Sequence, residues 1–203
     1  SIRIGGTGDD GINTGDSHSG GSRGLLNFYG DDARSEVILD NAGNVYLASC
    51  SQSIDFFTTP NAPFKTKSGG ASDQDAVLIK TSPDLGALLM STYFGGSNLD
   101  AAYVLGVSPI NGDIWICGAT ESSDFPGNKS GTVGPAYSGG STEGFVAVFS
   151  NDGTVLKKST FIGTAAQDAV LGFEFDRTGD PYIMGVTYGT WPIINAAYGT
   201  ANA

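Results

Sequence analysis

A short pattern that recurs three times limits what this chain of 203 residues can fold into. A turn glycine followed by an alternating apolar strand appears in "GNVYLAS", "GDIWICGAT" and "GDPYIMGVT". The glycines that open them, Gly43, Gly112 and Gly179, stand 69 and 67 residues apart. A loop block with aromatic residues and prolines follows each strand, and residues 75–96 match residues 144–164. Blocks that repeat in a fixed order indicate an array of one small unit.

Each unit reads as four short strands separated by tight turns. The 31 glycines fall between short runs of Val, Ile, Tyr, Phe and Thr, and Asn-Gly or Asp-Gly turns separate several of these runs. An all-β fold is therefore expected. A third copy begins near Asp168 and stops after its second strand. The strands of the two full copies are expected at 34–39, 44–50, 75–81 and 87–94, and at 101–107, 113–119, 145–150 and 154–161.

Four antiparallel strands per repeat describe a β-propeller blade, whose small sheet buries both faces against its neighbours. A β-solenoid is the alternative, but its repeats are usually far shorter. We expect an incomplete propeller or a fragment of a larger one. Its parts are the end of a preceding blade with a Gly-, Ser- and Asp-rich loop (1–33), a blade (34–100), a second blade (101–167) and the first half of a further blade (168–203).

The motifs also resemble a known family. "LDNAGNVYLAS", "SIDFFTTPNAPF", "DQDAVLIKTSPDLG" and "STYFGGSNLD" in the first copy, and "GDIWICGATESSDFP", "EGFVAVFSNDG" and "STFIG" in the second, are similar to the bacterial SBBP repeat, named for seven-bladed β-propellers. The resemblance covers about residues 25–198. Phe57 stands where the family usually has proline, and "TWP" replaces "DFP" in the third copy.

The resemblance implies a bacterial protein that is exported and works outside the cell or at its surface, of the kind carried by the type IX secretion system and linked to gliding or adhesion. Two full blades with part-blades are too few to close a ring, which needs about four to eight. We therefore expect the remaining blades to come from a larger parent chain, or else from other subunits.

Charge and hydropathy exclude some partners. With 21 acidic and 10 basic residues the formal charge is −11, which would repel nucleic acid and anionic lipid. No apolar run approaches the roughly 18 residues of a membrane span, and no leader pattern opens the sequence. Cys50 and Cys117 lie in strand-like runs, where we interpret them as buried thiols; a disulfide between them is the alternative.

Few motifs suggest chemistry. Residues 5–13 match the calcium-binding nonapeptide pattern, with Asp9, Asp10 and Asp16 as the candidate ligands, but only one copy is present, so the segment is interpreted as the turn out of a preceding blade. "GGSRG" (20–24) matches the G-x-S-x-G nucleophile pattern without a helix after it, and the only histidine, His18, lies in the same Gly- and Ser-rich run. We expect no catalytic residue, metal site or cofactor.

Acidic residues recur at matching places in the units. Asp100 and Asp168 are expected to cap turns or to accept hydrogen bonds from backbone amides between blades. A carboxylate pair for glycoside cleavage is the alternative, because such pairs form in space and leave no sequence spacing.

Aromatic residues in the long loops are the candidate binding residues. They recur at one place in each unit, where they could stack on sugars or anchor a protein, or else pack between blades. These residues are Phe56, Phe64, Phe125, Tyr137, Trp191 and Tyr198.

The sequence thus favours a surface or secreted module for binding, adhesion or scaffolding, with a protein or glycan ligand, rather than an enzyme. A polysaccharide hydrolase or lyase with its site in the central channel is the rival hypothesis. A passive spacer or secretion cargo is the third.

Overall fold

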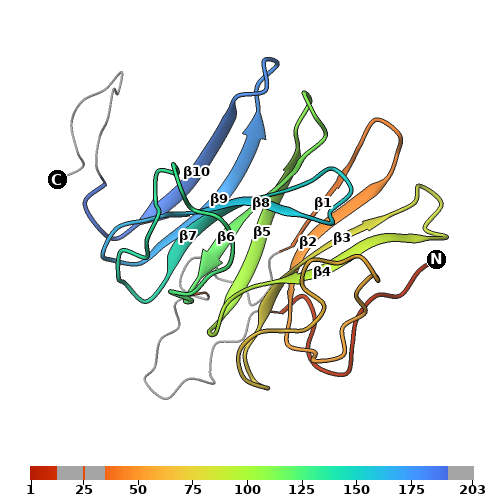
Figure 1. Cartoon of the computed structure of the whole chain (residues 1–203), viewed down its shortest axis with the longest axis horizontal. Coiled ribbons are helices and arrows are strands. Elements are labelled where there is room, and N and C mark those ends of the chain that lie inside the picture. The colour runs from red at the N-terminus through yellow and green to blue at the C-terminus, as the bar shows by residue number, and fades with distance from the viewer. Residues whose placement is uncertain (13–24, 26–34, 192–203) are drawn as a thin grey trace.

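The computed structural model describes residues 1–12, 25 and 35–191, which form an all-β structure of antiparallel sheets (Figure 1). Two sheets have four strands each and a third has two. In chain order the strands are β1 (Glu36–Leu39), β2 (Val45–Ser51), β3 (Asp75–Thr81), β4 (Leu88–Phe94), β5 (Asp100–Val107), β6 (Ile114–Thr120), β7 (Glu143–Phe149), β8 (Leu156–Ile162), β9 (Asp168–Phe175) and β10 (Pro181–Thr187). No helix in the described ranges could span a bilayer.

The strand prediction is confirmed, since each of the eight predicted strands ends within two residues of its expected bounds. Neighbouring strands in each sheet are consecutive in the chain, in the orders β1-β2-β3-β4, β5-β6-β7-β8 and β9-β10. The chain therefore builds each sheet completely before it starts the next one.

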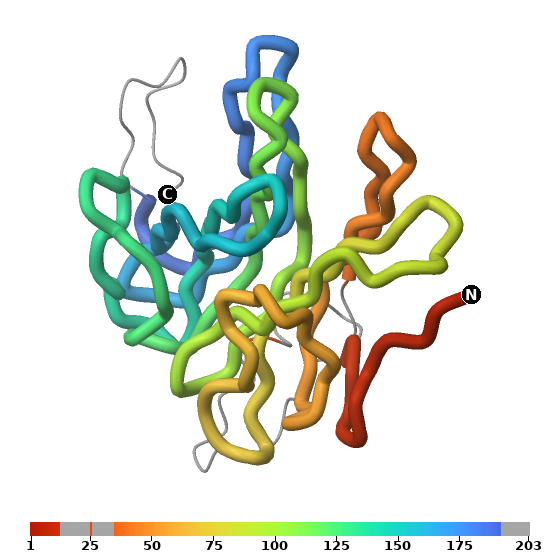
Figure 2. Tube along the Cα trace, turned by 45° about the vertical axis from the view of Figure 1, so that its right-hand side comes forward, coloured from red at the N-terminus to blue at the C-terminus, as the bar shows by residue number. Residues whose placement is uncertain are grey.

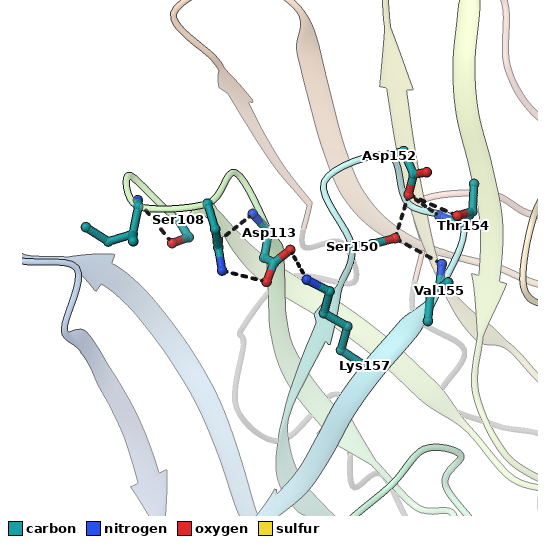
Figure 3. A network of polar contacts seen from close by, with 9 residues as sticks. Ser108, Asp113, Ser150, Asp152, Thr154, Val155 and Lys157 are labelled. Carbon is teal, nitrogen blue, oxygen red and sulfur yellow. Dashed lines mark hydrogen bonds and ion pairs between the residues drawn. The ribbon is translucent and has the colours of Figure 1, made fainter.

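Tight turns set the strand ends. Gly43, Gly112 and Gly179 have φ of 79°, 73° and 89°, a region that glycine enters without steric penalty. In the β7–β8 turn the Asp152 carboxylate accepts hydrogen bonds from the Ser150 hydroxyl (2.6 Å) and the Thr154 backbone N–H (3.1 Å), as Figure 3 shows. The turn conformations and hydrogen bonds fix the geometry of the hairpins and hence the register of the strands.

The first strand of each later sheet packs on the sheet before it. β5 contacts β1, β2 and β3, and β9 contacts β5, β6 and β7. One apolar core joins the first two sheets: Phe94 of β4 lies 4.5 Å from Phe125 and 5.7 Å from Phe145, ring centroid to ring centroid. Burial of both faces explains why the strands are more apolar than a simple alternation.

A bulge bends β5 between Ala102 and Val104. Here β5 approaches β6 so closely that a methyl group at Gly118 would lie 1.9 Å from the Ala101 carbonyl oxygen. Gly185 in β10 lies in the same way against the Ala169 carbonyl oxygen, 2.5 Å from a methyl group at that position. A glycine is therefore required at this point in β6 and β10, whereas β2, whose pairing has no bulge here, carries Ser49.

The first sheet begins earlier in the chain than its first named strand. Asp10 forms an isolated antiparallel bridge with Ser51, and the Gly11 N–H donates to the Cys50 carbonyl oxygen (2.8 Å). Asp100 pairs with Thr120 in the same way in the second sheet. Residues 9–11 thus pair with the end of β2, on the same side of β2 as β1.

Candidate functional site

The two aromatic residues nearest the strand ends are core residues. Phe56 is 6% exposed and Phe125 is 1% exposed. The Phe56 N–H donates to the Tyr93 hydroxyl (2.9 Å), which in turn donates to the Ser53 carbonyl oxygen (2.6 Å). Neighbouring side chains therefore cover both rings in the folded chain.

The second aromatic residue of each long loop holds the loop against the outer strand. The Phe64 ring lies 5.9 Å from the Phe94 ring, and the Tyr137 ring lies 5.4 Å from the Phe161 ring. Both rings are partly buried against the core of the first two sheets. Trp191 is 43% exposed, and Tyr198 lies outside the described residues. The structure therefore brings four of the six candidates into packing contacts rather than into one binding surface.

Recurrent aspartates organise the connections between sheets. Asp10, Asp100 and Asp168 each accept the backbone N–H of the residue four positions earlier, at 2.8, 2.7 and 2.6 Å. Asp100 also accepts hydrogen bonds from the hydroxyls of Thr120 and Ser122. The structural role expected for Asp100 and Asp168 is confirmed by these contacts.

At two of these three connections, a second aspartate from the long loop accepts further hydrogen bonds. Asp55 accepts the Thr7 N–H (2.8 Å) and the Thr7 hydroxyl (3.0 Å). Asp124 accepts the Ser97 N–H (2.9 Å) and the Ser97 hydroxyl (3.0 Å). The same pair of hydrogen bonds therefore occurs at the start of both four-stranded sheets. Its sequence signal is the aspartate of "IDF" and "SDFP".

Two buried acidic groups meet at each junction between sheets. Asp75 at the start of β3 and Asp100 flank Gly95, and Glu143 at the start of β7 and Asp168 flank Gly163. Burial raises the pKa of Asp75 to about 7 and that of Asp100 well above its usual range, and the charge of Asp75 adds to the effect on Asp100.

One oxygen of the strand residue lacks a hydrogen-bond partner at both junctions. These atoms, Asp75 Oδ1 and Glu143 Oε2, are buried. An ionised carboxylate is destabilised there, and burial accordingly raises the pKa of Glu143 as well as that of Asp75. The sequence analysis did not find these pairs, although an acid precedes the apolar run in both "QDAVLIK" and "EGFVAVF".

The motifs singled out for calcium and nucleophilic catalysis gain no support. Asp10 is occupied by the Gly6 N–H and by the hydroxyls of Ser51 and Ser53. Asp16, His18 and residues 20–24 lie outside the described ranges. Within those ranges, no three His, Cys, Asp or Glu side chains are grouped so that they could hold a metal ion.

Both cysteines are buried thiols, as interpreted from the sequence, and not the two halves of a disulfide. Burial raises the pKa of Cys50 to about 12 and that of Cys117 well above its usual range. Thiols in this state are poor nucleophiles.

A groove of about 800 Å³ lies where the three units converge at their hairpin ends. The hairpins β1–β2, β5–β6 and β9–β10 point to the same side of the molecule (Figure 2). Tyr46 and Phe175 contribute rings, and Lys80, Glu174 and Arg177 contribute charges. Lys80 Nζ lies 4.8 Å from the centre of the Tyr46 ring. Sequence reasoning missed this groove because its lining comes from turns far apart in the chain.

No protein-family model matches the chain, and no curated protein sequence matches it. The structure defines the class of the molecule as an all-β repeat protein built from antiparallel four-stranded sheets. Assignment of the chain to a particular repeat family depends on the sequence motifs described above.

Proposed function

We propose that the chain is a segment of a β-propeller with blades of the SBBP type, and that it serves a bacterial surface or secreted protein as a binding, adhesion or scaffold module. Consecutive sheets of one strand order and equivalent junctions at Asp100 and Asp168 support the propeller. Export by the type IX system, and a link to gliding or adhesion, belong to the proposal on the strength of the family resemblance.

The observation that carries the binding function is the groove at the hairpin ends. It combines the partly exposed rings of Phe173 and Phe175 with charges of both signs from Lys80, Glu174 and Arg177. Aromatic faces beside charged and hydrogen-bonding groups suit a glycan or a polar protein surface. Because the inner strands β1, β5 and β9 all reach it, the groove would open on the axis of a complete propeller.

An enzymatic function has less support. Asp40 and Asp176 lie in the groove. Despite partial burial, hydrogen bonds from Asn44, Tyr46 and Ala42 lower the pKa of Asp40. Hydrogen bonds from Thr178 and the Asp180 backbone lower the pKa of Asp176. Glycoside cleavage needs a carboxylic acid that stays protonated, and these two carboxylates are held in the ionised form.

Binding to immobilised bacterial and plant polysaccharides tests the function. The double variant Glu174→Gln/Arg177→Ala leaves the net charge unchanged and alters two exposed side chains of the groove. We expect it to weaken binding at least tenfold, whereas Lys65→Ala, in an exposed loop position away from the groove, should not. Equal binding by the groove variant, or no binding to any polysaccharide, contradicts the groove assignment. Release of shortened sugar products would favour the hydrolase or lyase instead.

A further inference from the structure

The strand β10 is exposed along its whole length, unlike its counterparts in the other sheets. Counted back from the last residue of each strand, Val186 and Met184 correspond to Cys50 and Ala48 of β2. Val186 and Met184 are 41% and 63% exposed, whereas Cys50 and Ala48 are 1% and 0% exposed. The sequence places apolar side chains here, but nothing in the described structure covers them.

The outer edges of the two complete sheets are protected by their own loops. The Thr59 N–H donates to the Ser91 carbonyl oxygen (3.0 Å), and the Tyr93 N–H donates to the Phe64 carbonyl oxygen (3.2 Å). On β8 the Phe161 N–H donates to the Gly134 carbonyl oxygen (3.0 Å). Loops that fold back in this way prevent the unwanted pairing of edge strands.

Charged side chains protect other edges. The Glu36 carboxylate accepts the Leu105 N–H of the inner strand β5 (2.6 Å), and β8 carries the exposed residues Lys157 and Lys158. Within the described ranges β10 pairs with β9 alone, and residues 181–187 carry no charge. In the part of the chain that the structure describes, neither a loop nor a charged side chain protects its other edge.

We propose that the free edge of β10 is a docking site for a two-stranded antiparallel β-hairpin with the chemistry of β7–β8. β3 pairs with all seven residues of β2, and β7 pairs with all seven residues of β6. The same register on β10 places an acidic residue of the hairpin opposite Thr187, as Asp75 stands opposite Ser51 and Glu143 opposite Thr120. Main-chain hydrogen bonds would supply affinity and the apolar strand would cover Met184 and Val186.

Charge favours such a hairpin over a second copy of this chain. Residues 143–162 contain two acidic and two basic residues and are formally neutral, whereas each whole chain carries −11. Two copies would repel each other, and a copy could not offer its β4 or β8 edge, because loops already cap both. This proposal rests on one part of the proposed function, the repeating unit of four strands. It does not depend on what binds in the groove.

The test uses the full chain and a fluorescently labelled peptide of residues 143–162. Fluorescence anisotropy should show saturable one-to-one binding, and hydrogen exchange should show new amide protection at residues 181–187. The double variant Met184→Lys/Val186→Lys should weaken binding at least tenfold. Val133→Lys introduces a lysine at a loop residue that is 85% exposed and should leave binding unchanged. A peptide with Ala147→Pro, which cannot form the ladder, should not bind.

Binding that is insensitive to the two lysines, protection on strands other than β10, or equal binding of the proline peptide would overturn the proposal. Concentration-dependent dimers that protect β10 without any peptide would identify a second copy as the occupant instead. Glu174→Gln/Arg177→Ala should capture the hairpin as well as the unaltered chain does. The experiments can therefore refute the binding function of the groove and the docking function of the β10 edge separately.

Discussion

Asp75 and Asp100 belong to consecutive sheets and lie on either side of Gly95: a methyl group on that glycine would be 2.7 Å from both the Asp100 Oδ2 atom and the Asp75 carboxyl carbon. Both side chains are at most 1% exposed. Asp100 receives three hydrogen bonds, whereas Asp75 Oδ1 receives none. A single proton between the two acids would satisfy that oxygen and remove the repulsion, so the contact between the sheets should depend on pH.

Raising the pH through neutrality should destabilise the protein. Burial raises the pKa of Asp75 to about 7, while an unfolded aspartate titrates near about 4. Between these values the folded state binds more protons than the unfolded state, so the free energy of unfolding falls as the pH rises. We expect a loss on the order of 2 kcal/mol between about pH 5 and about pH 8, measured by urea denaturation. A free energy that stays level or rises over this interval would contradict the shared proton.

Asp75→Asn provides the matched control for that experiment. The amide is nearly the same size as the carboxyl group, cannot ionise and can donate a hydrogen bond to Asp100. The variant should flatten the pH dependence and be more stable than the unaltered chain at about pH 8. Glu121, whose pKa burial also raises to about 7, should account for part of the remaining slope.

Loss of the Asp100 carboxylate should lower the free energy of unfolding more than loss of the Asp168 carboxylate at the next junction. Asp100→Ala leaves the Gly96 N–H and the hydroxyls of Thr120 and Ser122 without their acceptor. We expect a loss of about 3 kcal/mol in the free energy of unfolding. Asp168→Ala removes contacts to Thr164 alone and should cost about 1 kcal/mol. Thermal and urea denaturation of both variants checks the order, and equal losses would show that the two junctions are not ranked by their hydrogen bonds.

The strands were predictable because their signals are local. Turn glycines such as Gly43 and Gly112 fix where hairpins reverse, and apolar alternation fixes which segments pair. The start of the first sheet was not predictable in this way. Asp10 bridges Ser51, 41 residues further along the chain, and no local pattern predicts a pairing over that separation.

The candidate site was less predictable than the fold. The recurrence of Phe56 and Phe125 is equally compatible with packing and with binding, and burial alone distinguishes them. The groove arises where Tyr46, Val107 and Phe175 converge from three separate units, which is a property of the packing of sheets. Sequence patterns report neighbours along the chain, so they could not supply it.

Gly118→Ala should be among the most damaging small substitutions. The added methyl group would lie 1.9 Å from the Ala101 carbonyl oxygen, a backbone atom held by the bulge of β5. We expect a loss of about 3 kcal/mol or more in the free energy of unfolding, or failure to fold. Gly131→Ala is the control, because no atom lies within 4 Å of its added methyl group and only its φ of 70° is unfavourable, at about 1 kcal/mol. Similar losses for both variants would mean that the close approach of β5 to β6 is not rigid.

Alanine variants of the buried Phe125 and the exposed Phe57 test whether the aromatic residues of the long loops pack in the core or bind a ligand. Phe125 is 1% exposed and its ring centroid lies 4.5 Å from those of Phe94 and Phe145, so Phe125→Ala should cost about 3 to 5 kcal/mol in urea denaturation. Phe57 is 62% exposed, and Phe57→Ala should change the free energy of unfolding by about 0.5 kcal/mol or less. If Phe125→Ala kept its stability and lost polysaccharide binding, the ring would be a ligand contact and its position in the core would not persist in solution.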